Sequence, residues 1–219
     1  MKVKAATFDI GGVLYSDDAF KRAIFSALNQ LTTVTQADFD QLYHDHLKAP
    51  DGSLRSKLCL SFLGSLDKKG ELMKLANEKW LFNDADQYQD GKECLIKLKQ
   101  MGLKIGIVAN QPPAAADRLK QDNLFELIDF LGISALVGIE KPDPGIFKLA
   151  IDKLAIPADQ IIHIGNRIDT DVNPAKALGM KTVWVRRGEA NPDPSKDDLA
   201  AADITVTDLK NLPELINSL

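Results

Sequence analysis

The stretch Ala5-Ala6-Thr7-Phe8-Asp9-Ile10-Gly11-Gly12-Val13-Leu14 decides the fold of this chain. Its apolar residues are typical of a short buried strand, and the two glycines permit a tight turn where that strand ends. The carboxylate of Asp9 is therefore expected at the carboxyl end of a strand. A catalytic nucleophile would occupy such a position.

Two later segments carry polar groups that could meet Asp9 in a parallel sheet. Residues 138–144 read Gly-Ile-Glu-Lys-Pro-Asp-Pro, and residues 161–171 read Ile-Ile-His-Ile-Gly-Asn-Arg-Ile-Asp-Thr-Asp. After residue 90 helix and strand patterns alternate, which predicts a parallel sheet with strands at 104–109, 130–134, 161–165 and 181–185. Open sheets of this class bind ligands beyond the carboxyl ends of their strands. The polar residues at or just after such ends are Asp9, Asn110, Lys141 and Asn166.

Residues 17–81 have a wholly helical pattern, with apolar residues recurring three and four positions apart. This block separates the first strand from the others, so it is expected to be an insertion that lies over the strand ends. We predict an α/β core domain of residues 1–15 and 84–219 and a four-helix cap domain of residues 16–83. Residues 186–198 are rich in Pro, Asp and Gly and predict a surface loop bordering the site.

The composition favours a small-molecule partner. The chain of 219 residues carries a net charge of −4 and has no run of basic residues, which argues against nucleic acid or an anionic membrane as partner. The N-terminus shows neither an export signal nor a membrane segment, so a cytoplasmic location is expected. Cys59 and Cys94 lie far apart within helical patterns and are expected to be reduced, packed thiols. The sequence does not indicate the oligomeric state.

The motif residues of the chain resemble those of the haloacid dehalogenase (HAD) superfamily of hydrolases, whose four ordered motifs can be laid along nearly all of it. In phosphatases of that family the first motif has two aspartates two residues apart, the second a Ser or Thr, the third a Lys, and the fourth a Gly-Asp pair and a further Asp. Asp9, Lys141 and Asp171 match three of these places. The resemblance implies a Rossmann-like parallel sheet of order 5-4-1-2-3 between layers of helices, with the helical block as a cap.

The resemblance also implies a phosphatase that acts on a small phosphorylated metabolite through an aspartyl-phosphate on Asp9. Lys141 would be the second catalytic residue, and it would bind the phosphate together with Gly11, Gly12 and Asn110. Mg²⁺ would be the cofactor, because a dication can offset the repulsion between a carboxylate and a phosphate. The implied ligands of this ion are Asp9, the main-chain carbonyl of Gly11, Asn166 and Asp171. Asp169 would support these ligands without binding the ion itself.

Three motif places depart from the phosphatase pattern. Gly11 replaces the second aspartate, Ala109 the Ser or Thr, and Asn166 a metal-binding aspartate. Loss of a general acid–base group typically lowers the rate by ~10²–10⁴-fold, so the active site is degenerate. Two alternatives stay open: a HAD-fold binding or regulatory protein with impaired catalysis, and a metal-independent hydrolase of the dehalogenase type.

Other charged residues have simpler interpretations. His163, between isoleucines in a strand, is expected to be a hydrogen-bonded core histidine. Lys21, Arg22, Arg55 and Lys57 in the helical block are expected on solvated faces, although one of these cations could contact an acidic group of a substrate. The sequence does not choose among them.

Overall fold

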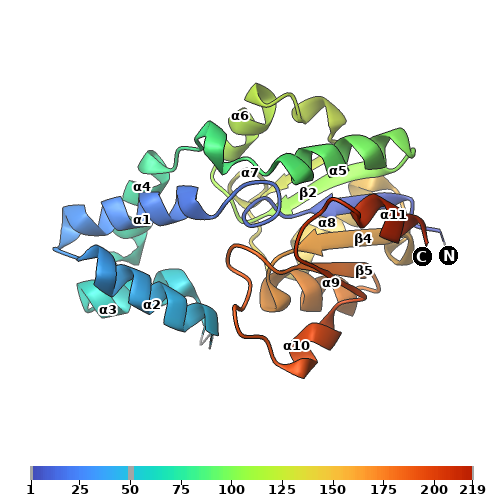
Figure 1. Cartoon of the computed structure of the whole chain (residues 1–219). Helices are drawn as coiled ribbons and strands as arrows, with labels where there is room; N and C mark the ends of the chain where they lie inside the picture. The colour runs from blue at the N-terminus through green and yellow to red at the C-terminus, as the bar shows by residue number, and fades with distance from the viewer. Residues whose placement is uncertain (1, 49–51, 219) are drawn as a thin grey trace.

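The computed structural model describes residues 2–48 and 52–218, and within them the chain forms a six-stranded parallel sheet (Figure 1). The strands lie in the order β3-β2-β1-β4-β5-β6. From the other edge this is the predicted order 5-4-1-2-3 with one strand added beside β5, so the predicted α/β class is confirmed. The strands are β1 (Ala5–Phe8), β2 (Lys104–Ala109), β3 (Phe130–Ile133), β4 (Ile161–Gly165), β5 (Lys181–Val185) and β6 (Ile204–Val206). The third was predicted one residue longer, but Ser134 already begins a helix.

Helices cover both faces of this sheet (Figure 1). Alternate residues of β2 point to opposite faces, so that Ile105 and Ile107 join one hydrophobic cluster and Val108 joins another. The first cluster includes apolar residues of α5 (Gln89–Gln100), α6 (Ala114–Gln121) and α11 (Leu212–Asn217). The second includes residues of α8 (Pro144–Leu154) and α9 (Asn173–Ala177). Two short helices, α7 (Ser134–Val137) and α10 (Lys196–Ala201), lie in the connections.

Four helices fill the segment between β1 and α5, and we call them the cap helices: α1 (Asp18–Leu31), α2 (Gln36–Lys48), α3 (Leu54–Leu63) and α4 (Lys69–Lys79). They bury a hydrophobic cluster of their own, in which Phe39, Leu58 and Leu72 are almost completely inaccessible to solvent. Figure 1 shows them beside the sheet, at the end toward which the strands run. We keep the division into a cap of residues 16–83 and a core of the remainder as a proposal.

Local signals in the sequence explain two of the helix starts. Asp143 accepts a hydrogen bond from the backbone N–H of Gly145 at 2.7 Å, and Pro144 is the first residue of α8, as its sequence predicts. Thr35 likewise bonds to Asp38 at the start of α2. The N-terminal capping bond of Asp143 fixes where α8 begins, and so where the loop that carries Lys141 ends.

Over residues 2–48 and 52–218, no helix is both long enough and apolar enough to cross a membrane.

Candidate active site

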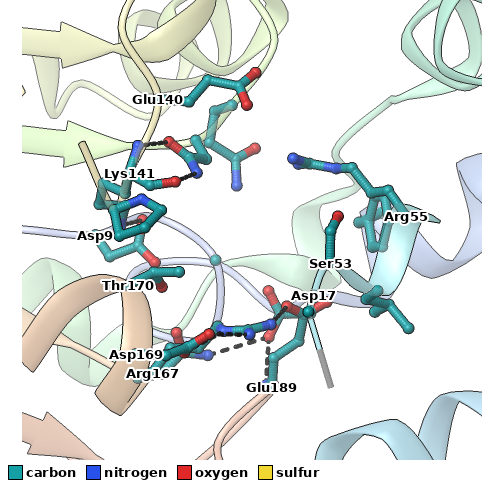
Figure 2. Close-up of a pocket in the computed structure, with 18 of the residues that line it drawn as sticks. Asp9, Asp17, Ser53, Arg55, Glu140, Lys141, Arg167, Asp169, Thr170 and Glu189 are labelled. Carbon is teal, nitrogen blue, oxygen red and sulfur yellow. Dashed lines mark hydrogen bonds and ion pairs between the residues drawn. The ribbon is translucent and has the colours of Figure 1, made fainter. Parts of the chain in front are cut away.

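The carboxyl ends of three neighbouring strands bring the predicted polar residues together. Asp9 follows β1, Asn110 follows β2 and Asn166 follows β4, and β1 pairs with both of the other strands. Lys141 lies in the loop between α7 and α8 and reaches the same edge of the sheet. The three remote segments that the sequence singled out therefore converge (Figure 2).

A buried row of charges forms the floor of the site. The ammonium of Lys141 lies 3.0 Å from an oxygen of Asp9 and 2.5 Å from an oxygen of Asp171. Asp9 is 9% exposed and Asp171 is fully buried. One cation thus holds two carboxylates in place, and a buried ion row of this kind fixes geometry more than it adds stability.

The two carboxylates of this row have pKa values pushed in opposite directions. Burial raises the pKa of Asp9 to about 6, because Lys141 only partly offsets the loss of solvation. Burial also acts to raise the pKa of Asp171, but Lys141 and His163 outweigh it and the pKa is lowered. Two acids with separated pKa values are typical of a working site. At neutral pH Asp9 is ionised, as a nucleophile must be.

His163 lies behind this row and supports it. One ring nitrogen is 3.0 Å from the hydroxyl of Thr7 and the other is 3.4 Å from Asp171. The side chain is buried, and burial lowers its pKa in spite of Asp171. The interpretation as a hydrogen-bonded core histidine is confirmed.

Asn110 holds the loop that carries the lysine. Its side-chain amide donates to the backbone oxygen of Lys141 at 2.9 Å and accepts from the backbone N–H of the same residue at 2.8 Å. Its direct contact with a phosphate stays a prediction. The structure gives it a second task, which is to position Lys141.

The turn after β1 requires its glycines. Gly12 has a φ of +65°, and a Cβ at this position would lie 2.0 Å from the side-chain nitrogen of Asn166. Gly11 has no room for a side chain either, since a Cβ there would lie 2.4 Å from a carboxylate oxygen of Asp17. Real Cβ atoms essentially never approach a neighbour so closely. The space beside Gly11, where the resemblance expects an aspartate, is filled by the carboxylate of Asp17.

Sequence reasoning missed Asp17. It directly precedes α1, a position typical of a helix cap, yet its side chain makes no capping bond. Instead it accepts from the backbone N–H of Glu189 at 2.8 Å and from Asn166 at 3.4 Å. Burial, followed by the negative charges of Glu189 and Asp9, raises its pKa well above the usual range. The glycine two residues after Asp9 was the available signal, because it leaves a space for a remote carboxylate.

One side wall of the site is formed by Arg167, Asp169, Thr170 and Glu189. The guanidinium of Arg167 is paired with Asp169 at 2.7 Å and with Glu189 at 3.5 Å. Asp169 lies on a π-helical turn, Ile168–Val172, and its contact to Arg167 keeps it a supporting residue in our proposal. Arg187 donates to the carbonyl of Gly12 and so ties the predicted loop to the turn after β1. The prediction that this loop borders the site is confirmed by Glu189, which lines the cavity.

A cavity of about 620 Å³ lies between this floor and the cap helices. Its volume suits a small metabolite, since ligand pockets typically measure ~300–1,000 Å³. The core contributes Asp9, Asn110, Lys141 and Asn166 to the lining. The cap side contributes Phe20, Ser53, Leu54, Arg55, Lys69 and Trp80.

The fit of the implied Mg²⁺ depends on which oxygens remain available. Both side-chain oxygens of Asp171 are bonded, one to Lys141 and one to the N–H of Arg167, which favours a role in fixing the lysine. Among the described residues no group of three His, Cys, Asp or Glu side chains has the spacing of a metal site. Asp9 has a second carboxylate oxygen outside the ion pair with Lys141, and Asn166 has an amide oxygen outside its two donated bonds.

An all-oxygen donor set suits a hard dication. The raised pKa values of Asp9 and Asp17 also indicate negative charge that a cation would offset. The donors present therefore fit Mg²⁺, with fewer carboxylates than a strong site would have.

Comparison with known families agrees with this arrangement. The model of the haloacid dehalogenase-like hydrolases matches residues 3–179. The chain belongs to this family. As a HAD-like hydrolase it is 28% identical over 211 residues to the glyceraldehyde 3-phosphate phosphatase of Methanopyrus kandleri, with 90% of each chain covered. It is 26% identical over 233 residues to the protein of the same name from Pyrococcus furiosus, covering 98% of this chain and 93% of that one.

Solved HAD structures share its fold. A predicted phosphoglycolate phosphatase from Haemophilus somnus superimposes with a TM-score of 0.80 at 20% identity, over 98% of both chains. The HAD-hydrolase YfnB from Bacillus subtilis, solved bound to magnesium, has a TM-score of 0.72 at 15% identity, over 99% of this chain and all of that one. At these identities the likeness concerns the fold.

Proposed function

We propose that this HAD-like hydrolase is a phosphatase that removes the phosphate from a small phosphorylated metabolite. The observation that carries the proposal is the row of Asp9, Lys141 and Asp171 at the strand ends, open to a cavity of metabolite size. The similarity to phosphatases from Methanopyrus kandleri and Pyrococcus furiosus supports it.

In this proposal Asp9 attacks phosphorus, so that a bond forms between its carboxylate oxygen and phosphorus while the ester bond to the alcohol breaks. The acyl phosphate is then hydrolysed by water, which frees Asp9 and inorganic phosphate. Lys141 neutralises part of the charge on the transferred group, and Asp171 and Asn110 hold the lysine in place. The glycines at 11 and 12 let main-chain groups approach the phosphate closely.

We further propose Mg²⁺ as cofactor, held by Asp9, the main-chain carbonyl of Gly11 and Asn166. When bound, it would supply the positive charge that a phosphate needs beside a carboxylate. Asp171 stays in the proposal as a residue near this ion, with its main contact to Lys141.

The departures from the phosphatase pattern remain, but Asp17 makes the missing second aspartate a less serious loss. Gly11 and Ala109 remove two side chains that the family uses. The carboxylate of Asp17 lies where the side chain of residue 11 would be, so the site does not lack a second carboxylate. This arrangement supports an enzyme over a binding protein. We also keep a cytoplasmic location as part of the proposal, supported by two buried free cysteines.

The test is hydrolysis of 4-nitrophenyl phosphate with and without Mg²⁺, because its leaving group needs little protonation. Asp9→Asn should abolish turnover, while Asp152→Asn, an exposed aspartate on α8, should leave it unchanged. Absence of turnover in the wild-type protein would favour the catalytically impaired binding protein. Turnover that persists in Asp9→Asn would remove Asp9 as the nucleophile.

A further inference from the structure

Among the described residues, two cations of the cap line the cavity, Arg55 and Lys69. Figure 2 shows the side chain of Arg55 extending from the cap into the cavity, on the side of Glu140 and away from Asp17, Asp169 and Glu189. Its guanidinium lies 5.6 Å from the centre of the Phe20 ring. Among the residues that the structure describes, no carboxylate forms an ion pair with it.

The other cations around the cavity have partners. Lys141 is shared by two carboxylates, and Arg167 is paired with Asp169 and Glu189. Lys69 on α4 donates one of its three N–H bonds to the hydroxyl of Ser56 on α3, at 2.9 Å. Arg55 is thus the cavity-lining cation with the most donors left for a ligand.

The cations that the sequence could not separate are now distinguished by position. Arg22 is paired with Asp86 at 2.6 Å, and Lys21 lies over the ring of Tyr43. Neither of these residues nor Lys57 lines the cavity. The structure therefore selects Arg55.

The distribution of charge gives the ligand a direction. The phosphate to be removed belongs at Asp9 and Lys141. A second anionic group on the same molecule would find Arg167 on the side wall already paired with Asp169 and Glu189, and would be attracted toward Arg55 (Figure 2). A guanidinium offers five N–H donors in a planar fork that binds a carboxylate or a phosphate through two parallel bonds.

We propose that Arg55 is a specificity-determining residue, and that the substrate carries a second anionic group, a carboxylate or a further phosphate, away from the phosphate being removed. The inference rests on the proposed phosphatase function and narrows it to phosphorylated acids or bisphosphates. Phosphorylated aldehydes and alcohols lack the group that Arg55 would bind and are poor substrates in this proposal.

The experiment compares 3-phosphoglycerate with glyceraldehyde 3-phosphate, which differ only in a carboxylate against an aldehyde. Arg55→Met keeps an apolar stem on Phe20 and removes the charge. It should lower kcat/KM for the acid about 10- to 100-fold, mainly through KM, and change that for the aldehyde about threefold or less. Arg55→Lys keeps the charge but lacks the planar fork of donors. Its kcat/KM for the acid should lie between those of wild type and Arg55→Met.

Controls separate this role from others. Lys57→Met on the same helix should leave both substrates unaffected. If Glu140→Gln reproduced the loss for the acid, Arg55 would act by pairing with Glu140 and the inference would be overturned. A wild-type protein that uses the aldehyde as well as the acid would overturn it too. With 1,3-propanediol bisphosphate against propyl phosphate, the same variants show whether a second phosphate serves in place of the carboxylate.

A measurement of binding in a variant that does not turn over tests the role of Arg55 separately from the proposed phosphatase function. Calorimetry on Asp9→Asn and on Asp9→Asn with Arg55→Met measures the affinity for 3-phosphoglycerate and for glycerol 3-phosphate. A preference for the acid that disappears with Arg55 supports the inference even if the wild-type protein shows no hydrolysis. Equal affinities, or no binding of either compound, would overturn it, whatever the outcome of the phosphatase assay.

Discussion

Replacing Asp9 with asparagine should make the protein more stable, although it removes the proposed nucleophile. Burial raises the pKa of this carboxyl from 3.8 to about 6 because desolvation outweighs the attraction of Lys141. Each unit of difference between the folded and unfolded pKa corresponds to about 1.4 kcal/mol. The ionised carboxylate therefore costs about 3 kcal/mol of folding free energy, and the asparagine variant escapes this cost.

The pH dependence follows from the sign of the change. A carboxyl with a raised pKa in the folded state ionises first in the unfolded chain, so wild-type stability falls as pH rises from about 4 through about 6. The advantage of Asp9→Asn should be about 3 kcal/mol at pH 7.5, roughly half of that at pH 5, and about 0.5 kcal/mol at pH 4. In Tm the gain at pH 7.5 corresponds to about 6–12 °C for a chain of this size.

The assay is urea unfolding followed by tryptophan fluorescence in buffers with EDTA, at the three pH values. Asp152→Asn, on the exposed side of α8, is the matched control and should show no such gain. An Asp9→Asn variant less stable than wild type at pH 7.5 would refute the reasoning. So would a gain that is the same at pH 4 and pH 7.5, because the cost would then not arise from ionisation.

Four further outcomes are expected. Lys141→Met, which leaves two buried carboxylates without their cation, should lower stability by about 3–5 kcal/mol in the same unfolding assay. Millimolar Mg²⁺ should raise the Tm of wild type but not that of Asp9→Asn, and a rise in both would place the ion elsewhere. Gly11→Ala should lose about 1–3 kcal/mol through the contact with Asp17, and adding Asp17→Ala should restore most of it. Leu58→Ala in the core of the cap helices should cost about 2–5 kcal/mol, measured as a shift of the urea midpoint.

Much of the fold could be predicted because its signals are local. Three of the strands have the bounds that their apolar runs and turns predict, and α8 starts at its Asp-Pro signal. β6 is the strand that the predicted order lacks, since three residues at a sheet edge carry little pattern. The cap helices were predicted from apolar residues at helical spacing. The hydrophobic cluster that these helices share agrees with this prediction.

The candidate site could be predicted in part. Asp9 was found because the ends of parallel strands must share an edge, and Lys141, in the loop between α7 and α8, was found because it matches the motif lysine of the resemblance. Their ion pair places the two side chains together. Asp17 was not found, because its neighbours in sequence explain it as a cap, and only the packing of Gly11 and Glu189 around it gives it another role. Asn110 lines the cavity, and its contact with a phosphate stays a prediction, but its bonds to the backbone of Lys141 could not be predicted from the sequence.

The sequence by itself determined where most strands lie along the chain, the glycine turn and the acid that follows the first strand, since periodicity and turn chemistry act over a few residues. The order of the strands in the sheet came from the family resemblance. The tertiary structure alone decided that one lysine serves two carboxylates, that Asp17 fills the space beside Gly11, and that Arg55, rather than Lys21, Arg22 or Lys57, lines the cavity. These depend on which side chains meet when distant segments pack, and the free energy of a charge is set by the groups around it in space.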